Sequence, residues 1–132
     1  MADIIIEVGD EAFPACLTGQ HCPETVRLIL GALPIESVAR QWGEEIYFEI
    51  PVEAALENGV DRVSRGALGY WPQGRCFCIF YGPTPMSRTP DEIVPASAVN
   101  LVGTIENPDA LKAHAAGEAV RIRRLTPADT FG

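Results

Sequence analysis

The sequence predicts a mainly β fold, a closed antiparallel barrel capped by about two short helices. Several short segments alternate apolar and polar residues and are separated by Gly, Pro, Asn or Asp, which is typical of strands joined by turns. Only two segments show helical spacing, and one hairpin is apolar on both faces, so both of its faces must be covered. The 132 residues form one predicted domain, residues 1–132, without a repeat or linker.

The first elements follow from changes in hydrophobic period. Residues 4–8 and 13–17 flank a turn at Gly9 and predict a β-hairpin. Pro23 suits the first turn of a helix that Pro34 ends, because proline has no amide hydrogen to donate inside a helix. We expect this helix to cover one side or opening of the barrel.

The middle and end of the chain continue the pattern. Residues 46–50 predict a strand, and residues 52–58 a single helical turn. The four prolines of residues 83–95 predict an ordered surface loop, since proline cannot donate to a sheet ladder. Residues 99–105 predict the next strand.

The last two elements are a short helix and a strand. Asn107 is expected to cap a helix that starts at Pro108 and stops at Gly117. Residues 118–125 then form the last strand.

Residues 66–85 are the most informative segment, with two apolar strands around a turn and a glycine-proline loop at the end. Trp71, Pro72, Gln73 and Gly74 predict a three-residue loop with Gly74 as its left-handed residue. Side chains alternate along a strand, which separates two apolar sets. One set contains Cys76, Cys78 and Phe80, and the other contains Phe77, Ile79 and Tyr81.

Three segments resemble one known family. They are residues 42–51, residues 66–85 with Gly-Tyr-Trp-Pro-Gln-Gly at 69–74 and Gly-Pro-Thr-Pro at 82–85, and residues 95–103. They resemble the small prokaryotic cyclophilin-like family, which is related in fold to cyclophilin-type prolyl isomerases. The resemblance implies a cyclophilin-like barrel over nearly the full length of the chain.

The resemblance does not extend to the isomerase signature. True cyclophilins carry a Phe-His-Arg triplet whose arginine is thought to hydrogen-bond the prolyl nitrogen, and this sequence has no such triplet. Arg40 is the only arginine near the corresponding position, so no catalytic residue is assigned and Arg40 is the one candidate. Rotation about a peptide bond has a barrier of about 18–20 kcal/mol, and an apolar groove alone does not favour the twisted transition state. Weak or residual prolyl isomerase activity is the alternative function.

The leading interpretation is a binding module. A groove with Arg40 at its rim would accept a small apolar ligand or a proline-containing peptide. The competing interpretation is that the same aromatic side chains are simply core, because buried aromatics usually serve packing. The aromatic residues of the predicted groove are Tyr47, Tyr70, Trp71, Phe77 and Phe80.

The net charge of −8 opposes binding to nucleic acid, because phosphate recognition needs clustered basic residues. The one basic cluster, Arg121, Arg123 and Arg124, alternates with apolar residues and predicts a solvated strand face. No apolar run approaches the roughly 20 residues that cross a bilayer, so no membrane association is expected. The start of the chain lacks a secretory signal pattern, which predicts a cytoplasmic location.

The four cysteines favour burial over metal binding. Five residues lie between Cys16 and Cys22 and one lies between Cys76 and Cys78, unlike zinc motifs with about two to four intervening residues. A structural zinc would need His21 or His114 close to the cysteines. We expect no metal and no cofactor. The adjacent pair Glu44 and Glu45 is expected to diverge and to serve solubility.

Overall fold

The computed structural model describes residues 3–131 and forms a nearly closed antiparallel barrel, as the sequence predicts. The strands of this described part make one sheet in the order β3-β9-β1-β2-β8-β6-β7-β5-β4. They are β1 (Ile4–Val8), β2 (Glu11–Leu17), β3 (Ile35–Val38), β4 (Arg40–Gln41), β5 (Glu45–Glu49), β6 (Ala67–Trp71), β7 (Cys76–Phe80), β8 (Asn100–Ile105) and β9 (Ala119–Arg124). The helical elements are α1 (Pro23–Ala32) and the 3₁₀ helices η1 (Pro108–Ala113) and η2 (Pro127–Phe131).

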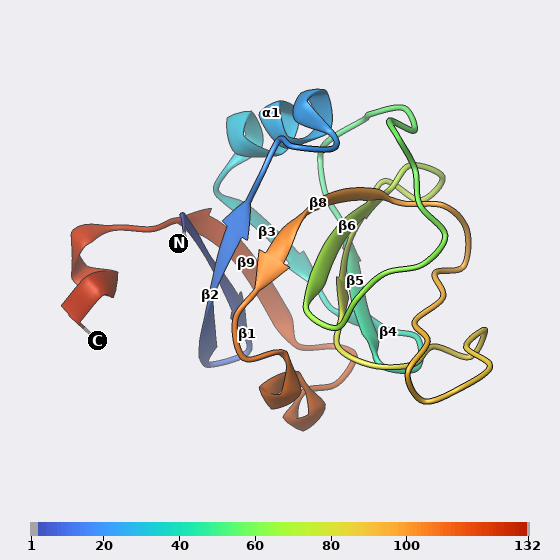
Figure 1. Cartoon of the computed structure of the whole chain (residues 1–132). Helices are drawn as coiled ribbons and strands as arrows, with labels where there is room; N and C mark the ends of the chain where they lie inside the picture. The colour runs from blue at the N-terminus through green and yellow to red at the C-terminus, as the bar shows by residue number, and fades with distance from the viewer. Residues whose placement is uncertain (1–2, 132) are drawn as a thin grey trace.

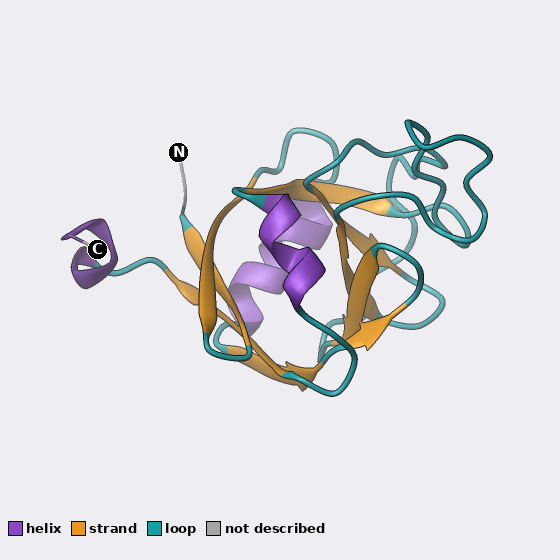
Figure 2. Ribbon diagram, turned by 90° about the horizontal axis from the view of Figure 1, so that it is seen from below, coloured by secondary structure: helices purple, strands orange, loops and turns teal. Residues whose placement is uncertain are grey.

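The helices lie at the ends of the barrel. Figure 1 shows α1 above the strands and η1 below them, while η2 extends to one side. Seen from below, the strands form a ring within whose outline α1 and η1 are seen, while η2 lies outside it (Figure 2). Val26 and Ile29 are the buried apolar residues of α1 and join the core inside this ring. No helix of the described residues is long and apolar enough to cross a membrane.

Strand alternation separates the inside of the barrel from its outside. Phe77, Ile79 and Tyr81 belong to the large core cluster together with Ile6 of β1 and Ile122 of β9. Cys76, Cys78 and Phe80 belong to a second, smaller cluster on the other face of the same sheet, together with Ile93 and Val99. The two predicted sets of side chains are therefore confirmed. The set with Cys78 faces outward, where the loops that lead to β6 and β8 pack against it.

The segment between α1 and β5 contains two strands that the sequence pattern did not predict. β3 pairs with β9 and β4 pairs with β5, at opposite ends of the strand order. Only Ala39 separates them, and its backbone bonds to Glu118 and Gly117. The chain thus crosses from one sheet edge to the other here, which brings the edges together.

The helical turn expected at residues 52–58 is absent. Its backbone is irregular, and side chains from distant elements take its hydrogen bonds. The Ala54 amide donates to the Tyr70 hydroxyl at 3.3 Å, and the Glu57 amide donates to Asn100 Oδ1 at 2.7 Å. These tertiary bonds replace the local bonds of a helix.

The helix after Asn107 is shorter than expected, and its cap differs. It is a 3₁₀ helix that ends at Ala113, and the His114 amide donates to the Leu111 carbonyl oxygen. Asn107 is left-handed (φ 57°) and its side chain makes no capping bond. By contrast, the irregular course of residues 83–95 agrees with the predicted loop.

The turn between β6 and β7 also differs from the prediction. Trp71 pairs with Cys76, so four residues form the loop, and Arg75 (φ 51°) is the left-handed residue instead of Gly74. Glycine is needed at position 74 for another reason. A Cβ atom there would lie 2.6 Å from Cζ3 of the Trp71 ring.

Candidate functional site

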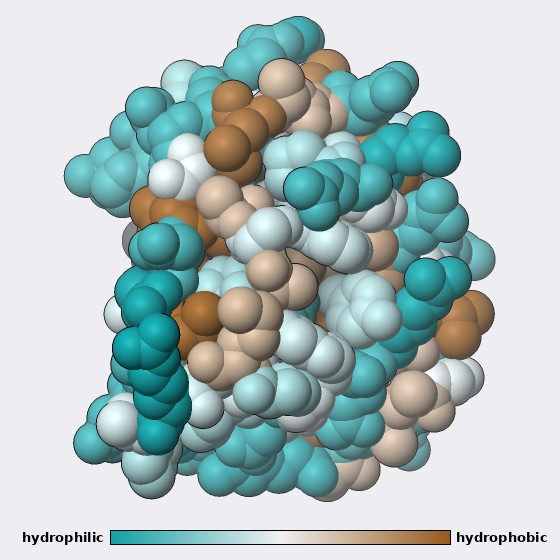
Figure 3. All heavy atoms as spheres, turned by 90° about the vertical axis from the view of Figure 1, so that its right-hand side faces the viewer, coloured by the Kyte–Doolittle hydropathy of each residue, from teal (hydrophilic) through white to brown (hydrophobic). Residues whose placement is uncertain are grey.

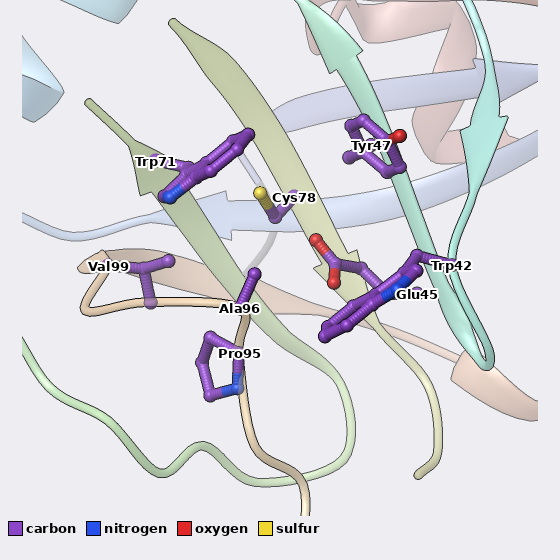
Figure 4. A pocket seen from close by; sticks show the side chains of 8 residues that line it. All are labelled: Trp42, Glu45, Tyr47, Trp71, Cys78, Pro95, Ala96 and Val99. Carbon is purple, nitrogen blue, oxygen red and sulfur yellow. The ribbon is translucent and has the colours of Figure 1, made fainter. Parts of the chain in front are cut away.

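A half-open pocket of about 230 Å³ lies on the outer face of β5, β6 and β7. This side of the molecule is seen in Figure 3, where apolar residues interrupt a largely hydrophilic surface. The segment from Pro95 to Val99 forms one wall of the pocket (Figure 4). Its lining residues are Trp42, Glu45, Tyr47, Trp71, Cys78, Pro95, Ala96 and Val99.

A tight turn places Trp42 opposite Glu45. Their backbones exchange hydrogen bonds of 2.9 and 3.2 Å across a two-residue loop. Gly43 takes a positive φ of 60° at the first position of this loop, where a type II′ turn requires glycine. Gly43 also lies against the next loop, because a Cβ there would be 2.7 Å from Pro85 Cδ.

The Gly-Pro-Thr-Pro segment connects the two sides of the pocket. The Glu44 amide donates to the Pro83 carbonyl oxygen at 2.9 Å, which ties the segment to the turn that carries Trp42. The Thr84 hydroxyl donates to the carbonyl oxygen of Val94, directly before the Pro95 wall. This sequence signature therefore has a structural role beside the pocket.

Two glycines allow the aromatic and aliphatic walls to pack. The Trp71 indole nitrogen donates to Ser97 Oγ at 2.6 Å, while its ring lies over Gly74. On β6, a Cβ at Gly69 would lie 3.2 Å from a methyl carbon of Val99, tighter than ordinary contact. Glycine at positions 74 and 69 therefore lets the Trp71 ring and the Val99 side chain lie close to the backbone of the pocket wall.

The Glu45 carboxyl is the acidic group of the pocket. The residue is only 6% exposed, and Figure 4 shows its oxygens in the middle of the ring of lining side chains. Burial raises the pKa of Glu45 to about 7, and a hydrogen bond from the Cys78 thiol lowers it only in part. No ion pair to Glu45 occurs among residues 3–131. This carboxyl can therefore gain or lose a proton near neutral pH.

Cys78 is a poor nucleophile in this setting. Burial and then the neighbouring Glu45 charge raise the pKa of the thiol well above its usual value. The thiol also faces the Cys76 carbonyl oxygen at 3.8 Å, so its single proton has two possible acceptors. Because only the thiolate attacks readily, Cys78 lines the pocket as a weak donor.

The structure brings together some of the predicted site residues and separates others. Tyr47 and Trp71 line the pocket. Tyr70, Phe77 and Phe80 are fully buried and do not line it. Tyr70 and Phe77 point into the barrel, and the Tyr70 hydroxyl donates to the Val52 carbonyl oxygen at 2.7 Å. Phe80 faces outward, but the loops above it cover it completely.

Arg40 lies on the pocket's face of the sheet without lining the pocket. It is exposed and stands opposite Tyr47 in the pairing of β4 with β5. The proximity of its positive charge lowers the pKa of Cys76, although burial of that thiol raises the pKa overall. The predicted rim position is compatible with this register.

Sequence reasoning missed Trp42, Glu45 and the Pro95–Val99 wall. Glu44 and Glu45 diverge as expected, but Glu45 is buried and does not serve solubility. Gly43, three residues after Arg40 and two before Glu45, was the available signal for a tight turn. That turn sets Trp42 and Tyr47 on the same face as Glu45.

The cysteines are free thiols, and three of them are buried. Cys22 donates to the Glu57 carbonyl oxygen at 2.7 Å. Within residues 3–131, no cluster of three or more His, Cys, Asp or Glu side chains is placed to hold a metal ion.

Comparison with known proteins agrees with this architecture. The family model described as "Cyclophilin-like" matches residues 2–123. The chain belongs to the cyclophilin-like family. A solved structure similar to this cyclophilin-like chain is the solution structure of the hypothetical protein AF2241 from Archaeoglobus fulgidus. It is 42% identical, with a TM-score of 0.80, over 94% of this chain and 95% of that chain. No curated protein matches the sequence.

Proposed function

We propose that this cyclophilin-like protein binds a small ligand with an apolar body in the pocket between Trp42, Tyr47 and Trp71. The observation that carries the proposal is the convergence of three aromatic side chains on one half-open cavity. Ligand sites are typically concave and largely apolar, with few polar groups that fix orientation. Glu45 supplies such a group.

Contacts behind the pocket hold its lining side chains in place, so that a ligand can bind without a large rearrangement of the protein. Trp71 is held by Ser97 and Gly74, and the turn at Gly43 is held by the Pro83–Pro85 segment. A preformed site avoids the entropy cost of ordering side chains on binding.

The alternative function, weak prolyl isomerisation, lacks an arginine in the pocket. Arg40 does not line the cavity, and the Cys78 thiol is buried. A proline-containing peptide segment could still insert its ring as a ligand, and the binding experiment distinguishes it from free small molecules.

The test is titration of ¹⁵N-labelled protein with cyclohexanol and, separately, with an alanyl-proline peptide, monitored through the indole N–H signals. We expect cyclohexanol to shift the Trp71 signal and Trp71→Ala to weaken binding about ten-fold or more. Val38→Ala, at an exposed site outside the pocket, is the matched control. Absence of any shift at millimolar concentrations would refute the binding role, and a shift by the peptide alone would favour the peptide.

A further inference from the structure

Glu45 is the one acid among residues 3–131 whose side chain is buried and not merely half-buried. Its only side-chain partner is the weak thiol donor of Cys78, although a carboxylate offers about four acceptor sites. Three half-buried acids, by contrast, hold strong donors. The partners are Thr25 for Glu57, Arg123 for Asp129 and His114 for Glu118.

The Glu45 carboxyl, which has no charged partner among residues 3–131, points into a half-open cavity. Figure 4 shows its oxygens between Trp42 and Cys78, facing the space bounded by Ala96 and Pro95. Burying a carboxylate without a charged partner is costly. A bound cation would remove that cost, because opposite charges attract strongly at a poorly solvated site.

The rings around the carboxyl favour the same charge. Trp42, Tyr47 and Trp71 all line the cavity, and the faces of aromatic rings attract cations. The protein's net charge of −8 adds a long-range attraction for cations. Apolar contact with these rings and with Val99 would hold the uncharged part of the ligand.

Resting on the proposed binding role, we infer that the ligand is a small organic cation, an ammonium group on an apolar body, with the ammonium group against Glu45. The ammonium N–H groups donate to the carboxylate oxygens, and the apolar body lies among the aromatic rings. An anionic ligand would bind weakly, because both the Glu45 carboxylate and the negative faces of the rings would repel it.

The ionisable groups that face Glu45 do not obscure the effect of its ionisation on ligand binding. Cys76 and Cys78 approach from β7, and burial raises the pKa of both thiols, so they remain protonated near neutral pH. Arg40, from β4, and Tyr47, from β5, share this face of the sheet. Binding of a cation should therefore strengthen as pH rises through about 7, where Glu45 ionises.

The experiment compares n-butylammonium, n-butanol and butyrate, which share a chain length and differ in charge. Their dissociation constants are measured from indole ¹H–¹⁵N shifts at pH 5.5 and pH 8. We expect n-butylammonium to bind about ten-fold more tightly than n-butanol at pH 8, and the ratio to fall toward one at pH 5.5. Glu45→Gln should abolish the preference at pH 8 while n-butanol still binds.

The matched control is Glu49→Gln, on the same strand and face, which removes the same charge outside the pocket. It should keep the preference. Equal affinity for n-butanol and n-butylammonium at pH 8, or preference for butyrate at pH 5.5, would overturn the cation inference and leave the binding role standing. Failure of all three probes to shift either indole would overturn both. If Glu45→Gln does not fold, the pH series on the unaltered protein decides the question.

Discussion

The indole ring of Trp71 lies over the backbone of Gly74, so closely that a Cβ atom at position 74 would be 2.6 Å from Cζ3. The same ring donates its N–H to Ser97 across the turn. One glycine thus determines how an aromatic wall of the pocket is oriented.

Gly74→Ala should displace the Trp71 ring and break its bond to Ser97. We expect a changed Trp71 indole N–H shift, about ten-fold weaker cyclohexanol binding and a stability loss of about 1–3 kcal/mol. Gly31→Ala in α1 is the control, because a Cβ there meets nothing within 4 Å. Unchanged binding in Gly74→Ala would show that the ring's position is not set by this contact.

Phe77→Ala should destabilise the barrel strongly. Phe77 is fully buried and stacks on Phe48 at a centroid distance of 5.4 Å. Loss of the ring leaves a cavity, at a cost of about 3–5 kcal/mol, and Ile79→Ala should cost about 2–5 kcal/mol. Denaturant unfolding measures both, with Val38→Ala, at a residue 56% exposed, as the control. Losses below about 1 kcal/mol at both core sites would contradict the barrel register.

Glu45→Gln should stabilise the protein at high pH. Burial raises the pKa of Glu45 from its unfolded value to about 7, so the folded state binds this proton more tightly. The resulting stability is present below the unfolded pKa and is lost as pH rises through about 7. We expect Glu45→Gln to gain about 2–4 kcal/mol over the unaltered protein at pH 8, relative to their difference at pH 4. Unfolding curves at both pH values measure this, and Glu49→Gln should show no such gain.

His114 should also make stability fall with rising pH. Burial acts to lower the pKa of His114, but hydrogen bonds with Glu11 and Glu118 outweigh it and raise the pKa. The histidinium therefore contributes stability that is complete below the unfolded pKa and is lost as pH rises through the folded pKa. We expect His114→Gln to flatten the pH dependence above about pH 6.5.

Ionisation of Glu45 also makes stability fall as pH rises. The effect of His114→Gln is therefore measured in protein that carries Glu45→Gln, by comparing the double variant with the Glu45→Gln single variant. Phe13, whose ring contacts His114 edge-on, carries no charge and so does not titrate beside it. A slope that is identical with and without His114 would show that its proton is not linked to folding.

A proline-peptide isomerisation assay should show little acceleration over the uncatalysed reaction, which takes tens to hundreds of seconds. No arginine lines the pocket. Arg40→Ala should leave the measured rate unchanged. Robust catalysis that disappears in Arg40→Ala would instead support the isomerase alternative.

The sequence by itself determined the fold class and which side chains share one face of a strand. A period of two places Phe77 and Cys78 on opposite faces wherever the strand lies, and local turn residues separate one strand from the next. These properties depend on neighbours in the chain. The hairpin of β1 and β2 and the start of α1 at Pro23 were therefore predictable.

Segments stabilised by distant residues were not predictable. Residues 52–58 are irregular because Tyr70 and Asn100 take their backbone bonds, and β3 forms only where β9 passes beside it. In the 72–75 turn, Arg75 adopts φ > 0 instead of Gly74, and the close approach of the Trp71 ring to Gly74 was equally not visible in the sequence.

The residues of the candidate site also fall into some that the sequence indicated and others that it did not. Tyr47 and Trp71 were identifiable as aromatic residues of the sheet, but alternation does not say which face lies inside the barrel, and so Tyr70 and Phe77 were grouped with them. Only the tertiary structure decided that Glu45 is a buried carboxyl. Its pKa depends on desolvation by side chains from several separate segments, and a charge loses its water only when all of those segments fold around it.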